Sequence, residues 1–136
     1  MNSLNAVVGF ALWTLLPVVI AVGWRVLEIL RGRPADSWTR GRDTPRPAFV
    51  VRMEHAHINC LETLPVFAAV VLAAAAMGKS SLTDSPAMLV LYARIAQSLT
   101  HAVGVSHWLV LIRATFYFIQ VALIVYMALR LLGWLA

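Results

Sequence analysis

Long apolar stretches, separated only by short polar segments, most strongly limit what this chain can fold into. Of its 136 residues, 61% are hydrophobic and 12% are charged, whereas soluble domains carry about 25% charged residues. A bilayer core about 30 Å thick needs about 20 apolar residues per helix, so the chain has room for four spans and little else. We therefore expect an all-α integral membrane protein, a four-transmembrane-helix up-and-down bundle in which residues 1–136 form a single domain.

The apolar stretches predict where the helices lie. We expect helices over about 4–30, 47–77, 86–102 and 108–135. Arg25 and Glu28, three residues apart near the end of the first helix, are predicted to form an ion pair at the membrane interface. The segment Gly32–Ala48 is rich in Arg, Pro, Gly and Asp, which indicates an irregular solvated loop.

The distribution of arginines predicts the orientation. Five of them lie in or beside the loop Gly32–Ala48, whereas the connection between the second and third helices carries only Lys79. Because basic residues concentrate in cytoplasmic loops, we expect this loop in the cytoplasm and both termini outside, in a bacterial inner membrane. The formal net charge of +5 is thereby explained by topology and by attraction to anionic lipid headgroups, and no nucleic-acid partner is expected.

The second predicted helix begins with an unusually polar segment, Arg52–Pro65. Four of its polar residues recur every three or four positions and so share one helix face: Arg52, His55, Asn59 and Glu62. An apolar stretch follows Glu62 at once, so its carboxylate is expected inside the membrane, where a lone charge costs at least ~2.5 kcal/mol. We therefore expect Glu62 to have an arginine partner.

Two further helices carry polar residues on one face. These are Arg94, Gln97 and His101 on the third helix, and Arg113, Tyr117 and Gln120 on the fourth. With the predicted topology, all three polar faces lie in the cytoplasmic half of the membrane and can meet at one depth. Arginines outnumber Glu62, so we expect a cytoplasm-facing cavity that binds an anion. In the alternative interpretation, these groups pair only with one another and hold the helices together.

A metal site is not predicted. His55 and His57 form an HxH pair, but residues two apart point to different sides of a helix, and no HExxH motif is present. The chain also has no GxSxG motif and no phosphate-binding glycine loop.

The segment AHINCLETLPVF, residues 56–67, resembles the MAPEG family, the membrane-associated proteins of eicosanoid and glutathione metabolism. The pattern of this family on its second helix is matched by Arg52, Ala56, Asn59, Glu62 and Pro65. Arg94 resembles the arginine of an RxxHxxxY-like pattern on the third helix, and Arg113 and Tyr117 resemble an Arg and a Tyr four residues apart on the fourth. The resemblance covers nearly the whole chain.

This resemblance implies a homotrimer that holds glutathione between neighbouring subunits near the cytoplasmic face. The implied activity is a glutathione transferase or peroxidase whose hydrophobic small-molecule substrates, lipophilic electrophiles, arrive from the bilayer. Arg113 would be the catalytic residue, stabilising the thiolate that glutathione needs as a nucleophile. The implied glutathione-binding residues are Arg52, His55, Asn59, Glu62, Arg94, His101 and Tyr117, with Glu62 suited to the γ-glutamyl ammonium.

Three positions differ from the family pattern. His55 replaces a second arginine that many relatives place on the second helix, Gln97 replaces a His, and His101 replaces a Tyr. They keep a second hypothesis open: a non-enzymatic trimeric membrane scaffold, or an anionic-lipid-binding protein, whose polar faces are structural.

Overall fold

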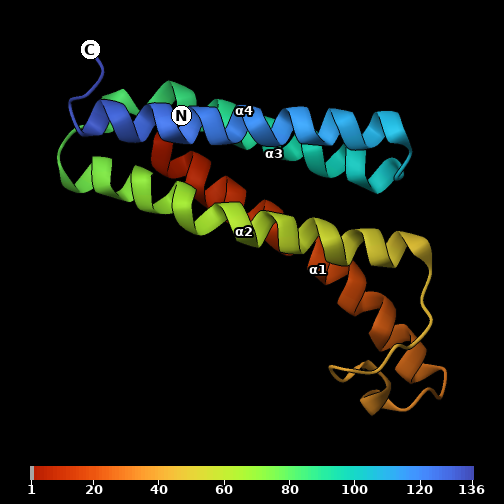
Figure 1. Ribbon diagram of the computed structural model, residues 1–136. Coiled ribbons are helices and arrows are strands. Elements are labelled where there is room, and N and C mark those ends of the chain that lie inside the picture. Colours follow the sequence, from red (N-terminus) through yellow and green to blue (C-terminus); the bar gives the residue numbers. More distant parts are fainter. Residues whose placement is uncertain (1) are drawn as a thin grey trace.

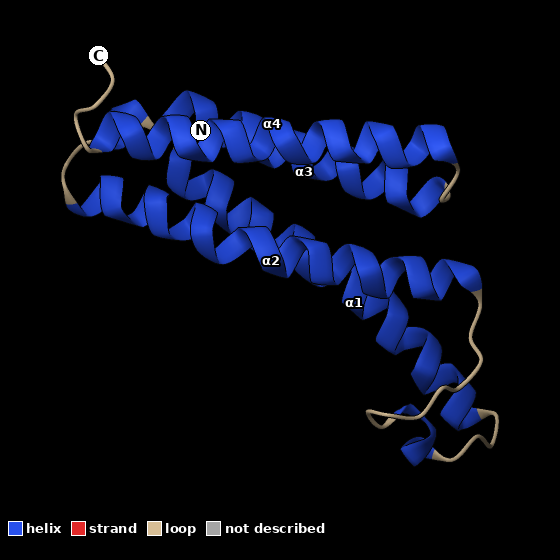
Figure 2. Ribbon diagram, viewed as in Figure 1, coloured by secondary structure: helices blue, strands red, loops and turns tan. Residues whose placement is uncertain are grey.

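The computed structural model describes residues 2–136, so only Met1 of the predicted domain lies outside the described residues. These residues form four long α-helices and two short 3-10 helices (Figures 1 and 2). The elements are α1 (Ser3–Leu30), η1 (Ala35–Trp38), α2 (Ala48–Ala76), η2 (Ser80–Leu82), α3 (Asp84–Val103) and α4 (His107–Leu131). The four predicted helices are confirmed; the largest difference is that α4 ends at Leu131 rather than at about 135.

The helices run up and down, as predicted. In Figure 1, α3 and α4 lie side by side, α2 lies below them, and α1 crosses behind α2 at an angle. The α1–α2 connection and the α3–α4 turn share one end of the bundle, which we call the loop end, and the α2–α3 connection lies at the other end. The start of α2, the end of α3 and the start of α4 therefore meet at the loop end.

A buried apolar cluster joins the four helices. Phe10 of α1 contacts Phe67 of α2, with ring centroids 5.5 Å apart, and Val90 of α3 and Met127 of α4 complete the contact. In a bilayer such contacts are stabilised mainly by van der Waals packing, since lipid tails are as apolar as the side chains. Many other large apolar residues, such as Leu12, face outward and form a surface suited to lipid.

Three helices, α1, α2 and α4, are long and apolar enough to cross a membrane. The polar side chains of α3 explain why it differs. Its four buried polar residues are Arg94, Gln97, Ser98 and His101, whereas the exposed residues of α3 include Leu89, Tyr92 and Leu99. The low hydropathy of α3 therefore comes from groups that face the other helices, and its outer face is largely apolar.

A buried amide pair joins α3 to α4. Nε2 of Gln120 donates to Oε1 of Gln97 over 2.8 Å and to the backbone oxygen of Phe116 over 2.9 Å. Both glutamine side chains are buried. Part of the predicted polar faces is therefore structural.

The end of α1 is set by a glycine. Gly32 has φ +100°, a conformation that strains residues with a Cβ, and the backbone N–H of Arg33 donates to the Glu28 carbonyl oxygen over 3.0 Å. This is a Schellman motif, and α2 ends in the same way at Gly78. The motif turns the chain out of α1 and into the arginine-rich connection.

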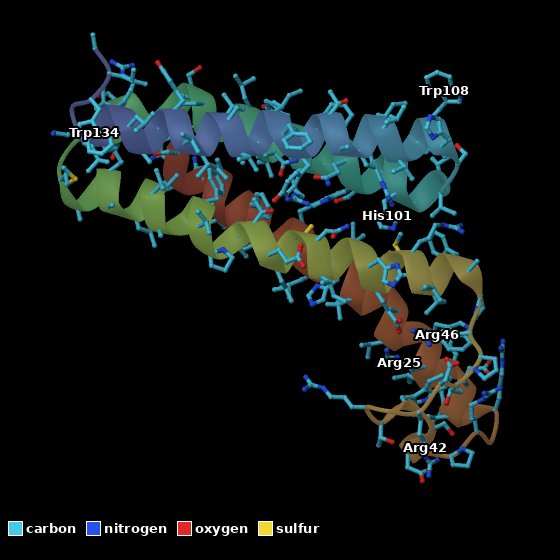
Figure 3. The ribbon with its side chains drawn as sticks, viewed as in Figure 1. Arg25, Arg42, Arg46, His101, Trp108 and Trp134 are labelled. Atoms are coloured by element: carbon cyan, nitrogen blue, oxygen red, sulfur yellow. The ribbon has the colours of Figure 1, made fainter. Side chains whose placement is uncertain are left out.

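The predicted ion pair between Arg25 and Glu28 is wrong. Arg25 instead pairs with Glu54 of α2, whose other carboxylate oxygen accepts from Nε of Arg46 over 2.8 Å (Figure 3). Glu28 pairs with Arg31, 2.9 Å away. Sequence spacing can predict only partners within the same helix. The crossing of α1 and α2 places Glu54 next to Arg25. Glu54 thereby fastens α1, the connection and α2 together.

We expect Glu54→Gln to lower the free energy of unfolding by about 1–3 kcal/mol, because it leaves two guanidinium groups side by side without a carboxylate. Thermal melting in detergent measures the effect. Asp36→Asn is the matched control, since Asp36 and Arg42 are 63% and 58% exposed and should contribute less than about 1 kcal/mol. Equal destabilisation by both variants would contradict a special role for Glu54.

For the amide pair we expect the substitutions Gln97→Leu and Gln120→Leu to be non-additive. Each single variant leaves a buried polar group without its partner, and the double variant removes both. A double-mutant cycle on unfolding in detergent should give a coupling energy of about 0.6–1.7 kcal/mol. Additive effects would show that the hydrogen bond does not stabilise the pairing of α3 with α4.

Candidate functional site

The predicted site residues lie in the half of the bundle nearer the loop end, from the first turns to the middle of α2 and α4 and from the middle to the last turn of α3. They form two groups, defined by distance from the loop end. The outer group is Arg52, His55, Asn59, His101 and Arg113. The inner group, farther along the helices, is Glu62, Arg94 and Tyr117, together with Thr63, which was not among the predicted residues. Within residues 2–136, α2 contacts α3 through Asn59 with His101 and Thr63 with Arg94, and α2 and α4 share a groove lined by Glu62 and Tyr117.

His101 lies at the centre of the outer group, buried between α3 and α2 (Figure 3). Its Nδ1 is 3.5 Å from Nδ2 of Asn59, and its ring centroid is 6.2 Å from that of His55. Two residues of α2 thus lie beside one buried histidine of α3.

Arg52 links α2 to the end of α3. Its Nε donates to the carbonyl oxygen of Ala102 over 3.1 Å, and its guanidinium lies over the ring of Phe49, 5.8 Å from the centroid. The last four carbonyls of a helix have no partner within the helix, and a cation there is favoured by the helix dipole. Arg52 therefore has a structural contact in addition to its predicted role in binding.

Arg94 is the most deeply buried charge of the inner group, with 1% of its surface exposed. Its Nη2 donates to Oγ1 of Thr63, and its guanidinium lies over the ring of Phe10, 5.3 Å from the centroid. Its Nε is buried and has no hydrogen-bond partner within residues 2–136. A cation so placed is only partly compensated, so a group with spare acceptors would stabilise it.

Sequence reasoning missed Thr63 and Phe10 as partners of Arg94. Thr63 could have been found, because it lies four residues after Asn59 and so continues the polar face of α2. Phe10 could not, since its contact depends on how α1 crosses α2 and α3.

Glu62 and Tyr117 face outward between α2 and α4. Both are exposed, and they line a groove of about 150 Å³. The remaining lining residues are Thr63, Val66, Val121, Ile124 and Val125. A groove with the volume of roughly five water molecules is too small to enclose a ligand the size of a tripeptide.

The predicted arginine partner of Glu62 is not present within one chain. Among residues 2–136, none forms an ion pair or a side-chain hydrogen bond with the Glu62 carboxylate. The reason is geometric: Arg94 points into the bundle toward Thr63, whereas Glu62 lies on the outer side of α2.

The two histidines of the HxH pair point in different directions, as predicted. His55 faces His101 of α3, whereas Nδ1 of His57 lies 2.8 Å from the carbonyl oxygen of Thr14 on α1. Because a carbonyl oxygen can only accept, Nδ1 of His57 carries the proton. His57 therefore belongs to the contact between α1 and α2.

The electrostatics of the two groups favour an anion. Arg52, Arg94 and Arg113 form no ion pair within residues 2–136, and Glu62 supplies a single carboxylate. Guanidinium groups bind carboxylates through paired hydrogen bonds, and a free carboxylate can receive an ammonium. Arginine beside a thiol also favours its thiolate form.

The sequence model of the MAPEG family matches residues 3–133, which include all four helices and every residue of both groups. A comparison with curated proteins found no match. This integral membrane protein therefore belongs to the MAPEG family, whose members generally use glutathione as substrate or cofactor.

Proposed function

We propose that this protein is a membrane-bound glutathione-dependent transferase or peroxidase that acts on lipophilic electrophiles. One observation carries the proposal: the polar groups at the loop end are brought together but incompletely paired. Glu62 has no partner, and Nε of Arg94 is buried without one, within residues 2–136. Glutathione offers what these groups lack, an ammonium for Glu62 and carboxylate and amide oxygens for the arginines.

In this proposal, each residue of the two groups binds the part of glutathione that lies nearest to it. Glu62 receives the γ-glutamyl ammonium, and Arg94 and Tyr117 hold the peptide from the inner side. Four residues of the outer group bind the carboxylates: Arg52, His55, Asn59 and His101. Bound glutathione supplies the thiol nucleophile.

Arg113 is the residue we assign to the thiolate. It lies half-buried near the start of α4, in the same outer group as His101. A guanidinium is charged at every physiological pH, so it stabilises a thiolate without competing for its proton. The groove lining is largely apolar, from Val66 to Ile124, and so suits a lipophilic electrophile that approaches the sulfur.

We further propose that residues 1–136 act as one domain of a homotrimer. The exposed position of Glu62 and Tyr117 supports this, because a second subunit placed against α2 and α4 would supply the missing wall of the groove. The arginine-rich connection Gly32–Ala48 then lies in the cytoplasm and both termini outside, in a bacterial inner membrane.

A non-enzymatic trimeric scaffold, or an anionic-lipid-binding protein, is the second candidate. The observations that favour it are the structural contacts of the polar residues: Gln97 with Gln120, and Arg94 with Thr63. In that case the polar faces hold helices together, and glutathione does not bind.

We expect millimolar glutathione to raise the melting temperature of the protein in detergent. A ligand that binds only the folded state at a hundredfold excess over its Kd adds about 2.7 kcal/mol of stability. Arg113→Ala should keep the fold but lose the thiolate absorbance of bound glutathione and conjugation of an aromatic electrophile. Arg130→Ala, at the far end of α4, is the matched control. If Arg113→Ala conjugates as fast as the wild type, its assigned role is wrong.

Glu62→Ala separates the two candidate functions. For an enzyme, we expect the variant to remain a trimer by light scattering and to lose the glutathione-dependent rise in melting temperature. For a scaffold, the variant should lose trimer or melt at a lower temperature even without glutathione, because Glu62 would be paired across subunits. Asp43→Ala, which removes an exposed carboxylate from the connection, should change neither property.

A further inference from the structure

A second polar cavity lies at the loop end, outside the two groups described above. It has a volume of about 170 Å³ and is formed by the end of α1 and the connection between α1 and α2. Four arginines line it: Arg25, Arg40, Arg42 and Arg46. Figure 3 shows three of them, Arg25, Arg42 and Arg46, around the folded connection. None of the four belongs to the proposed glutathione site.

The walls of this cavity are held in place by several contacts. Glu54 fixes Arg25 and Arg46, and Oγ1 of Thr44 donates to the carbonyl oxygen of Ser37 across the connection. The indole of Trp38 packs edge-on against Trp24, with ring centroids 5.1 Å apart. The connection is therefore a built structure with the arginines at defined positions.

Positive charge in the cavity exceeds negative charge. Glu54 neutralises one of its two arginine partners, and Arg42 pairs with exposed Asp36 at 3.4 Å. Arg40 forms no ion pair within the described chain. Two guanidinium charges of the four thus lack a carboxylate.

Two donors at the cavity also lack acceptors. Nε of Arg25 and Nε1 of Trp38 are buried, and neither has a hydrogen-bond partner in residues 2–136. Both residues line the cavity. A buried donor without an acceptor costs free energy, so an oxyanion that enters here is favoured by hydrogen bonding as well as by charge.

We propose that this cavity binds a phosphate group, carried by a lipid headgroup or by a soluble phosphate ester. A phosphate has several acceptor oxygens and one to two negative charges, which match the unpaired donors and the surplus arginine charge. The volume equals roughly six water molecules, enough for a phosphate group but not for a tripeptide. The exposed apolar residues Leu27 and Leu30 of α1 lie beside the connection and give the acyl chains of a lipid a surface to follow.

The test uses the full-length protein, delipidated in detergent, and measures binding of inorganic phosphate by calorimetry, with chloride at equal ionic strength as the reference. A second arm measures, in the same detergent, binding of short-chain phosphatidic acid, with short-chain phosphatidylcholine as the reference. Arg40→Gln removes a lining charge that has no ion pair to disrupt. Arg31→Gln, on an exposed side chain outside the cavity, removes the same charge from the same end of the bundle.

We expect Arg40→Gln to weaken phosphate or phosphatidic acid binding about tenfold, and Arg31→Gln to change it less than about twofold. If inorganic phosphate binds and the two variants behave as expected, a soluble phosphate is sufficient to occupy the cavity. Binding of phosphatidic acid alone, with the same pattern, identifies a lipid headgroup. Equal weakening by both variants indicates diffuse surface attraction and overturns the proposal, as does wild-type binding of neither probe.

The outcome is independent of the proposed function. Arg40 lies outside both site groups, so the rise in melting temperature with glutathione should be the same in Arg40→Gln and in the wild type. A missing glutathione effect with intact phosphate binding counts against the proposed function alone.

Discussion

Polar side chains in a bilayer must find their partners among protein groups, and the packing of α2, α3 and α4 depends on this constraint. Arg94 shows it most clearly. Its guanidinium is buried at the centre of the bundle, where Thr63 accepts one hydrogen bond and the face of Phe10 supplies a second favourable contact. The amide pair of Gln97 and Gln120 satisfies the same requirement between α3 and α4. Lipid could replace none of these contacts.

Some polar side chains do not find such a partner within the chain, and the function we propose depends on these side chains. Glu62 and Tyr117 lie on the outer side of the same helices, at a groove that one chain leaves open. If every polar residue were paired within the chain, the set would only hold the helices together. A set with a free carboxylate and a partly compensated guanidinium is instead suited to a ligand that carries both signs of charge.

The loop end joins two kinds of polar structure that differ in their surroundings. The site groups lie among helices, whereas the arginines of the connection lie on a folded segment outside the apolar spans. The two structures meet α2 at neighbouring residues. Glu54 pairs with Arg25 and Arg46 on the α1 side of α2, whereas His55, the next residue, faces His101 of the candidate site. Consecutive positions on α2 thus serve the connection and the candidate site, as expected for residues about 100° apart on a helix.

The sequence by itself determined the helices, their up-and-down order and the polar faces, because hydropathy and the 3.6-residue period are local properties of the chain. Membership of the MAPEG family also follows from the sequence. The partners were decided only by the tertiary structure. Arg25 pairs with Glu54 rather than Glu28, Arg94 turns inward to Thr63, and Glu62 remains on the surface, since each outcome depends on how α1 and α3 cross α2. Periodicity identifies the face on which a side chain lies, but which group packs against that face is fixed by helices distant in the sequence.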